Sequence, residues 1–362
     1  MGRIRWALRI VGVGITLVCV VAAGRFLLPQ PGIADQPGST QRQLAFVRDA
    51  LDDGADTAAQ GMFPEGYVFL NALYGLAWVQ AAHTDPDLRE PALRESRWAL
   101  ARVESDEGRA VFSPRLAPAY GVFWAGWSNW LRGAILTLDR SDPAEVRAFS
   151  DRSAELAQAF TASPTPFLQA YPGQAWPVDS TVAIASLRLH DTLFDARFAT
   201  VVEQWVGAAR AHLDPATGLL PHQVSAADGS PRTGARATSQ TVILRFLPEI
   251  DPAFARQQYA TYRDQFLAYP GGFGPALRSS RTASTGGAIS IPARWWRESA
   301  CPPPWSDSAR PGSTATPNSP RRSGPRANYW ACRSACPAPS ATPSAWYRSV
   351  TPSWCGRRPP GC

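Results

Sequence analysis

The pattern of apolar and polar positions over residues 41–278 is that of successive helices. Apolar residues recur there every three or four positions, the spacing of one helical face, whereas the alternation typical of half-buried strands is nearly absent. The pattern predicts apolar helical repeats at 44–51, 69–77 and 93–101 and further helices at 118–140, 144–161, 178–194, 198–212, 237–249 and 252–268. An all-α domain is therefore expected.

Two features indicate how these helices begin and pack. Asp142-Pro143 and Asp251-Pro252 each combine an N-cap residue with a proline suited to the first helical turn. Several helices are apolar around much of their circumference, as expected for the inner layer of a multi-layer helical fold. Helix hairpins joined by aromatic-rich loops favour an incomplete (α/α)6-type toroid over 41–278. In such a toroid the inner helix ends converge on a central cavity, where functional residues would lie.

The N-terminal segment 1–28 predicts a membrane anchor. Three arginines flank or precede fifteen residues without a charge at 10–24. As a helix, residues 6–28 would span about 34 Å, which is enough to cross a hydrocarbon core of about 30 Å. The expected partner of residues 6–28 is therefore the lipid bilayer.

The arginines on the N-terminal side of this segment predict its orientation. They place the N-terminus in the cytoplasm and the main domain, beyond a Pro/Gly/Ser-rich linker at 29–40, outside the cytoplasm. The alternative is a cleaved signal peptide, because Val21-Ala22-Ala23 resembles a small-residue cleavage site. The protein would then be secreted. Both interpretations put the helical domain beyond the cell membrane.

The composition changes abruptly at residues 279–362. This segment holds 11 Arg against two acidic residues, five of the six cysteines and 14 of the 34 prolines, with no Leu or Phe. It can bury too little apolar surface to offset the entropy of ordering, so a disordered low-complexity tail is expected. The abrupt break after Arg278 favours an out-of-frame translation as its cause, in which the correct reading frame would supply the last helices of the toroid. A natural low-complexity tail is the alternative.

The formal net charge of +7 says little about partners, because the basic excess lies in the tail. Residues 1–278 hold 25 Arg and 27 acidic residues, and a nucleic-acid partner is not expected for them. The four histidines lack the spacing of metal ligands, and Cys332-x-x-x-Cys336 lacks partner ligands. The glycines at 271–274 lack the residues of a phosphate-binding loop. Neither a metal nor a cofactor is predicted.

The densest cluster of polar and aromatic residues is 171–180, where a loop enters an apolar helix. Asp179 is either a simple N-cap or, desolvated beside Trp176, a general acid with a raised pKa. Glu65 has a similar loop-to-helix position and is the natural second carboxylate, although first-turn acids also favour the helix dipole.

Other candidates complete the predicted site. Tyr67 is either a proton donor or a half-buried aromatic residue with a satisfied hydroxyl, and His222 is either functional or a structural loop histidine. Trp124 and Trp127 fall on one helical face, where they either pack in the core or line a cavity. The residues predicted to contact a substrate are Trp124, Trp127, Asn129, Tyr171, Trp176 and Gln240.

A series of short motifs, taken in order, resembles the linalool dehydratase/isomerase family over about 200 residues. It includes Tyr67-Val-Phe-Leu-Asn-Ala-Leu-Tyr-Gly-Leu-Ala77, Gly126-Trp-Ser-Asn129, Leu213-Asp-Pro215 with His222, and Ile250-Asp-Pro-Ala-Phe-Ala255. The resemblance implies an exported α/α barrel, possible homo-oligomers, and cofactor-free dehydration and isomerisation of alkenyl alcohols.

The match also shows where this chain departs from the family. Tyr67 corresponds to a family tyrosine, but Trp127 replaces a histidine and Asp179 replaces a cysteine, and residues 20–300 contain no cysteine. We expect an acid/base lyase or isomerase acting on an alcohol or lipid-like small molecule. The alternatives are a carbohydrate-active hydrolase using Glu65 and Asp179, and a non-catalytic, truncated α/α module.

Overall fold

The computed structural model describes residues 13–20, 38–268 and 276–278. The chain divides into two compact units, Met1–Ala300 and Cys301–Cys362, and every described residue belongs to the first. This unit is predominantly helical, which confirms the all-α prediction. The predicted tail at 279–362 lies outside the described residues, as does most of the predicted linker at 29–40.

The helices follow the predicted order, with ends that differ by a few residues. They are α2 (Ser39–Asp52), α3 (Ala55–Met62), α4 (Gly66–Thr84), η2 (Pro86–Leu88), α5 (Arg89–Val103), α6 (Asp106–Arg109), α7 (Gly121–Leu138), α8 (Pro143–Ala162), α9 (Pro177–Leu193), α10 (Ala199–Ala211), α11 (Ala237–Ile250) and α12 (Pro252–Phe266). Asp142 and Asp251 cap α8 and α12 ahead of a proline, as predicted.

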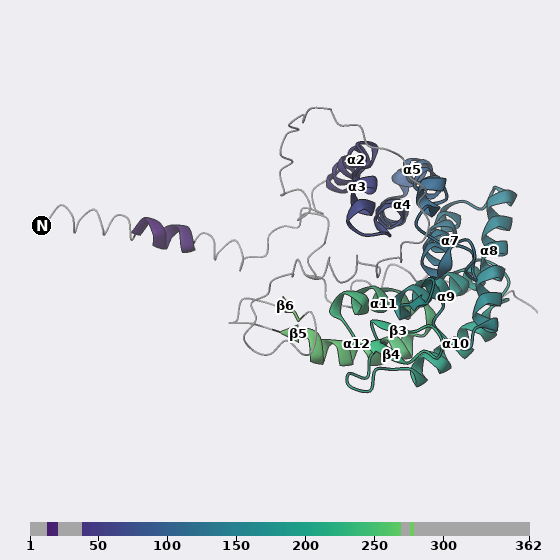
Figure 1. The fold of residues 1–362 in the computed structure, drawn as a ribbon. Helices are drawn as coiled ribbons and strands as arrows, with labels where there is room; N and C mark the ends of the chain where they lie inside the picture. Colours follow the sequence, from purple (N-terminus) through teal and green to yellow (C-terminus); the bar gives the residue numbers. More distant parts are fainter. Residues whose placement is uncertain (1–12, 21–37, 269–275, 279–362) are drawn as a thin grey trace, which may run out of the picture. The chain divides into compact units, whose positions relative to one another are not determined.

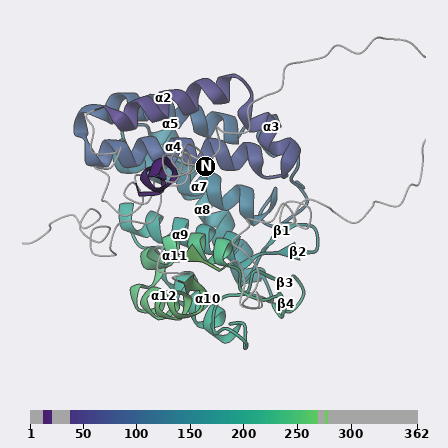
Figure 2. The same ribbon diagram turned by 90° about the vertical axis from the view of Figure 1, so that its left-hand side faces the viewer.

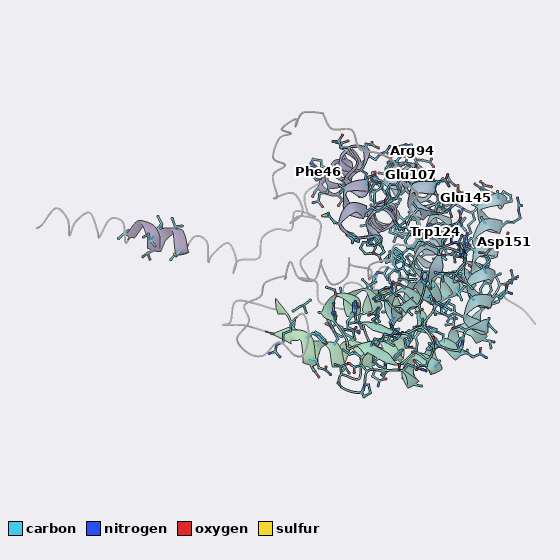
Figure 3. The ribbon with its side chains drawn as sticks, in the orientation of Figure 1. Phe46, Arg94, Glu107, Trp124, Glu145 and Asp151 are labelled. Atoms are coloured by element: carbon cyan, nitrogen blue, oxygen red, sulfur yellow. The ribbon has the colours of Figure 1, made fainter. Side chains whose placement is uncertain are left out.

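Four helices form a continuous inner row (Figure 1). Helix α4 packs on α7, α7 on α9, and α9 on α11. Each also packs on the helix that follows it as a hairpin: α5, α8, α10 and α12, respectively. Charged side chains of these second helices, such as Arg94 on α5 and Asp151 on α8, are exposed (Figure 3).

The centre of the packing is the contact between α7 and α9. Most residues of both helices are buried, as the apolar circumference of these segments predicts. At Gly126 the two backbones come so close that a Cβ would lie 3.1 Å from the backbone nitrogen of Ala183. The absence of a side chain at Gly126 is therefore what allows α7 and α9 to meet.

Short strands that the alternation pattern did not reveal join two of the loops. Strands β1 (Gln169–Tyr171) and β2 (Gln174–Ala175) precede α9, and β3 (Gln223–Ser225) and β4 (Pro231–Thr233) precede α11. They pair antiparallel in the order β1-β2-β3-β4 and lie together at one side of the helices (Figure 2). A second pair, β5 (Leu267–Ala268) with β6 (Ala276–Leu277), follows α12. Strands of two or three residues are too short for alternation to be visible in the sequence.

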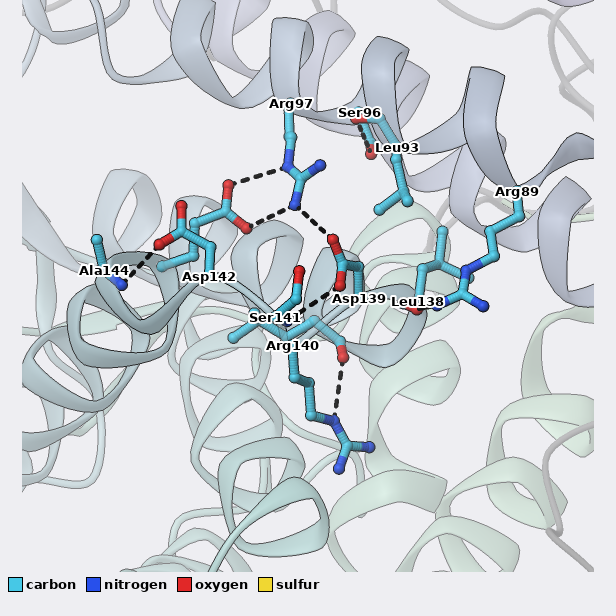
Figure 4. Close-up of polar contacts among 12 residues, drawn as sticks. Arg89, Leu93, Ser96, Arg97, Leu138, Asp139, Arg140, Ser141, Asp142 and Ala144 are labelled. Atoms are coloured by element: carbon cyan, nitrogen blue, oxygen red, sulfur yellow. Dashed lines mark hydrogen bonds and ion pairs between the residues drawn. The ribbon is translucent and has the colours of Figure 1, made fainter.

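Buried and half-buried ion pairs connect the hairpins. Asp56 on α3 is fully buried and accepts hydrogen bonds from Arg102 on α5, at 2.5 Å, and from Asn71 on α4, at 2.7 Å. Farther along, Arg97 on α5 donates to Asp139 and Glu145 at the turn between α7 and α8 (Figure 4). These contacts fix α5 against both neighbouring hairpins.

The predicted membrane segment is described only in part. Residues 13–20 are helical, and their large apolar side chains, Val13, Ile15, Leu17, Val18 and Val20, are 60–69% exposed. Among the residues that the structure describes, no helix has both the length and the apolar character needed to cross a membrane. The prediction of an anchor at residues 6–28 extends mostly over residues that are not described.

Candidate functional site

Glu65 and Asp179 occupy corresponding positions at the N-terminal ends of two inner helices. Glu65 is the N-cap residue of α4, but its side chain makes no capping hydrogen bond within the described structure. Asp179 is the third residue of α9, after Pro177 at the first position, and Trp176 is the N-cap residue. The interpretation of Asp179 as the N-cap is therefore wrong, and its carboxyl group is not used to cap α9.

Two glycines allow close backbone contacts at the starts of α4 and α7. Gly66 follows Glu65, and a Cβ there would lie 2.5 Å from the carbonyl oxygen of Ala59 on α3. Gly121 begins α7 with φ 78°, and a Cβ there would lie 2.3 Å from the carbonyl oxygen of Ala170 on β1. A larger residue at Gly66 would push the start of α4 away from α3, and one at Gly121 would push the start of α7 away from β1, which carries Tyr171.

The Asp179 carboxyl group is buried without a conventional partner. Asp179 is 7% exposed, and within the described residues no hydrogen bond or ion pair offsets the burial of its carboxyl group. Burial raises the pKa of Asp179 well above its usual value, and the charge of Glu65 raises it further. Of the two carboxyls, Asp179 is therefore the one that holds its proton more firmly.

Both acids influence the hydroxyl of Tyr171. Burial raises the pKa of Glu65, and backbone and Tyr171 interactions partly offset that effect. Burial raises the pKa of Tyr171, and the charges of Glu65 and Asp179 add to the shift. The buried Tyr171 hydroxyl forms no regular hydrogen bond with any described group, so its approach to Glu65 is looser than a regular hydrogen bond.

Aromatic rings form one wall of this site. The ring of Phe112 stacks on Tyr171 with a centroid separation of 5.5 Å and on Phe123 with 5.8 Å. Trp176 meets Tyr171 edge to face at 6.0 Å. Phe112 lies in a loop outside the predicted helices, and no local pattern marks it as part of the site. Its role results from the packing of distant segments.

Tyr67 belongs to a different group of side chains. It is 4% exposed, its hydroxyl interacts with Ser105, and the guanidinium of Arg102 lies over its ring at 5.1 Å. Burial raises the pKa of Tyr67. The structure thus surrounds Tyr67 with the ion-pair network of Asp56 and Arg102.

The predicted contact residues on α7 pack in the core. Trp124 is 1% exposed and donates through Nε1 to the carbonyl of Val103 at 2.8 Å. Trp127 meets the rings of Phe69 and Phe246 edge to face. Asn129 is also buried and donates to two serine hydroxyls, Ser153 and Ser186, at 3.0 Å each. These contacts account for Trp124 and Trp127 as packing residues and for the amide NH2 group of Asn129. The buried Oδ1 of Asn129 has no hydrogen-bond partner among the described groups.

His222 and Gln240 each connect the start of α11 to the segment 220–222. His222 Nδ1 lies 2.5 Å from the hydroxyl of Ser239. Burial lowers the pKa of His222 to about 4, with a contribution from Arg236, so its imidazole is neutral at pH 7. Gln240 donates to the carbonyl of Leu220 at 2.6 Å, and its buried Oε1 has no hydrogen-bond partner among the described groups.

One surface pocket lies away from Glu65 and Asp179, and the described residues form no metal-ligand cluster. A surface pocket of about 190 Å³ is lined by apolar residues that include Leu116, Ala159, Pro164 and Phe167. It includes neither Glu65 nor Asp179. In residues 13–20, 38–268 and 276–278, no three His, Cys, Asp or Glu side chains are grouped as metal ligands.

Comparison with known proteins adds no assignment, because no family model and no curated protein matches the chain. The resemblance to the linalool dehydratase/isomerase family stays a prediction. Among the predicted residues, the charge of Glu65 acts on both Asp179 and Tyr171, and the ring of Tyr171 meets that of Trp176. No hydrogen bond, ion pair or ring contact among the described residues joins this group to Tyr67 or His222.

Proposed function

We propose that this protein is an acid/base lyase or isomerase acting on a small, largely apolar alcohol, in the manner of the linalool dehydratase/isomerase family. One observation carries the proposal. A carboxyl group that is nine-tenths buried and has no conventional partner, that of Asp179, lies within electrostatic range of a second carboxyl and beside stacked aromatic rings. Acids with perturbed pKa values in such surroundings are typical of catalytic sites.

The different environments of the two acids assign their roles. Asp179 holds its proton more firmly and is the general acid, which protonates the substrate hydroxyl as the C–O bond breaks and water leaves. Glu65, which ionises first, is the general base and takes a proton from the adjacent carbon. The C–H electron pair becomes the new double bond. Proton return from Glu65 to Asp179 through the Tyr171 hydroxyl then closes the cycle.

The proposal includes the fold that the resemblance implies. Helices α4, α7, α9 and α11 correspond to four inner helices of an (α/α)6 toroid, and α5, α8, α10 and α12 to four outer ones. The row of inner contacts and the position of Glu65 and Asp179 at inner helix starts support this interpretation. The remaining inner helices of such a toroid would come from residues after α12.

The proposed location is the outer side of the cell membrane, with residues 6–28 as an uncleaved anchor. The large apolar side chains of residues 13–20, which are exposed on a helix, support the anchor. Secretion after cleavage is the alternative. An apolar substrate would reach an anchored enzyme from the bilayer.

The test is turnover of linalool by the full-length protein purified in detergent, followed by gas chromatography of alkene and alcohol products. Asp179→Asn and Glu65→Gln are each expected to reduce the rate by at least about 100-fold, the usual contribution of a general acid or base. Asp151→Asn, an exposed residue on α8, is the matched control and should leave the rate unchanged. Full activity of Asp179→Asn would refute the proposed mechanism.

The paired carboxyls also support a second candidate, a carbohydrate-active hydrolase in which the same two acids cleave a glycosidic bond. Release of nitrophenol from aryl glycosides, lost in both Glu65→Gln and Asp179→Asn, would favour the hydrolase over the lyase. Absence of turnover in both assays, in a folded protein, would favour the non-catalytic α/α module.

A further inference from the structure

A serine, a histidine and an aspartate are connected in series between α8 and the end of α9. Nε2 of His190 lies 3.3 Å from the hydroxyl of Ser150, and its Nδ1 lies 3.3 Å from Oδ1 of Asp191. The side chains of His190 and Asp191 are 2% and 1% exposed, whereas Ser150 is half-buried. The order of the three groups is the one that activates a serine for nucleophilic attack.

The contacts of Asp191 determine which nitrogen of His190 is available to Ser150. The Asp191 carboxyl accepts the backbone N–H groups of Arg197 at 2.9 Å and Phe198 at 3.0 Å, so it faces Nδ1 as an acceptor as well. Burial lowers the pKa of His190, and its imidazole is mainly neutral at pH 7. Because a neutral imidazole carries one proton, a proton on Nδ1 leaves Nε2 free to accept from the Ser150 hydroxyl.

Three phenylalanine rings surround the imidazole of His190. The ring centroids of Phe198, Phe194 and Phe149 lie 4.8, 5.3 and 5.5 Å from it. Their packing limits rotation of the imidazole and excludes water from it. Ser150 follows Phe149 on α8 and is half-buried, so its hydroxyl combines contact with the buried base and access from solvent.

We infer that Ser150 is a nucleophile that hydrolyses small carboxylic esters, with His190 as its general base and Asp191 as the residue that orients the base. The Ser150 hydroxyl transfers its proton to Nε2 of His190 while Oγ attacks the ester carbonyl carbon. The tetrahedral intermediate then breaks its bond to the leaving alkoxide oxygen, which takes the proton from Nε2, and the alcohol departs. An acyl group stays on Oγ.

Water completes the reaction through the same groups. Nε2 of His190 takes a proton from the water molecule as its oxygen attacks the acyl carbon, and the returning Ser150 Oγ takes that proton as the carboxylic acid is released. Arg147 is exposed and lies three residues before Ser150, on the same side of α8. Its positive charge is the nearest along α8 for the oxyanion of the intermediate. A hydroxyl reached from the helix surface suits small acyl groups.

This activity is independent of the lyase or isomerase proposed above. His190 follows Asp179 by eleven residues on α9, which corresponds to about 16 Å along the helix axis. The two sets of residues share no member. Ester hydrolysis by Asp179→Asn at the wild-type rate, and linalool turnover by Ser150→Ala at the wild-type rate, would each show that the two sites act separately.

The experiment uses the full-length protein in detergent and measures hydrolysis of p-nitrophenyl acetate. Ser150→Ala should reduce the rate above buffer by at least about 100-fold, whereas Ser163→Ala, at a half-buried serine that ends the same helix, should leave it unchanged. Diisopropyl fluorophosphate should modify the Ser150 hydroxyl with release of fluoride, as peptide mass spectrometry would show. Circular dichroism should confirm that both variants are folded.

The pH profile distinguishes a base from a histidine that only fills the core. The charged groups that act on His190 are Asp191, beside it on α9, and Arg197, before α10. Because the pKa of His190 is lowered, hydrolysis should persist below pH 6.5 and fall only when the imidazole is protonated. An unchanged rate in folded Ser150→Ala, or an unmodified Ser150 after treatment with diisopropyl fluorophosphate, would overturn the inference.

Discussion

The charge of Glu65, at the start of α4, raises the pKa of Asp179, at the start of α9. The two carboxyls come from distant parts of the chain, and burial opposes the ionisation of each. A protein selected for stability alone would not keep such a pair, because replacing a buried, unpaired charge by a neutral group is usually stabilising. Residues that destabilise their own surroundings in this way are typical of functional sites.

Asp179→Asn should therefore stabilise the protein at neutral pH. The pKa of Asp179 is raised in the folded state, so the carboxyl adds stability below its unfolded pKa of about 4 and loses that contribution as pH rises toward the folded value. The variant does not ionise and should have a higher Tm at pH 7.5, with a shift of about 2–4 °C for each kcal/mol gained.

The pH dependence distinguishes this effect from a change in packing. The advantage of Asp179→Asn in differential scanning calorimetry should be much smaller at pH 4 than at pH 7.5. The exposed Asp151→Asn on α8 should leave Tm unchanged at both pH values. A lower Tm for Asp179→Asn at pH 7.5 would mean that the carboxylate has a stabilising partner.

His222→Gln should reduce the sensitivity of the domain to mild acid. The pKa of His222 is lowered to about 4, so neutral His222 contributes stability above its unfolded pKa of about 6.5, and that contribution is lost as pH falls toward 4. One such group gives a slope of up to about 1.4 kcal/mol per pH unit in this range. Urea unfolding at pH 7.5, 6.0 and 5.0 should show a shallower slope in the variant. Equal slopes of unfolding free energy against pH in the wild-type protein and the variant would show that protonation of His222 does not destabilise the fold.

The sequence predicted the helices well because their signals are local. Apolar periodicity and the Asp-Pro caps at α8 and α12 each depend on residues within one or two turns. Local signals also marked Asp179 and Glu65 as candidates, since each follows an aromatic and proline-containing loop that enters an apolar helix.

The other parts of the site depend on packing between distant segments. Phe112 stacks on Tyr171 only because the loop before α7 meets β1, and nothing near Phe112 in the sequence indicates this. Tyr67 and Asp179 were expected to act together, but Tyr67 lies within the Arg102 network. The direction of a side chain at a helix start depends on neighbouring helices, which periodicity does not specify.

Asp56→Ala should strongly destabilise the domain. Asp56 is fully buried and accepts hydrogen bonds from Arg102 and Asn71. Its removal leaves the Arg102 guanidinium without its partner between α3 and α5, and breaking a buried pair in this way costs about 3–5 kcal/mol. Chemical denaturation should show this loss, whereas the exposed Asp49→Ala on α2 should change the free energy of unfolding by less than about 0.5 kcal/mol. A small loss for Asp56→Ala would indicate that water replaces the carboxylate.

The close approach of α7 and α9 can be tested with one methyl group. In Gly126→Ala the new Cβ would lie 3.1 Å from both the nitrogen and the Cβ of Ala183, and backbone cannot move aside as a flexible side chain can. The expected loss is about 1–3 kcal/mol of unfolding free energy. Gly207→Ala, at an exposed position of α10 with open space around its Cβ, is the matched control and should gain about 0.5–1 kcal/mol from helix propensity. Stabilisation by both substitutions would show that α7 and α9 separate at little cost.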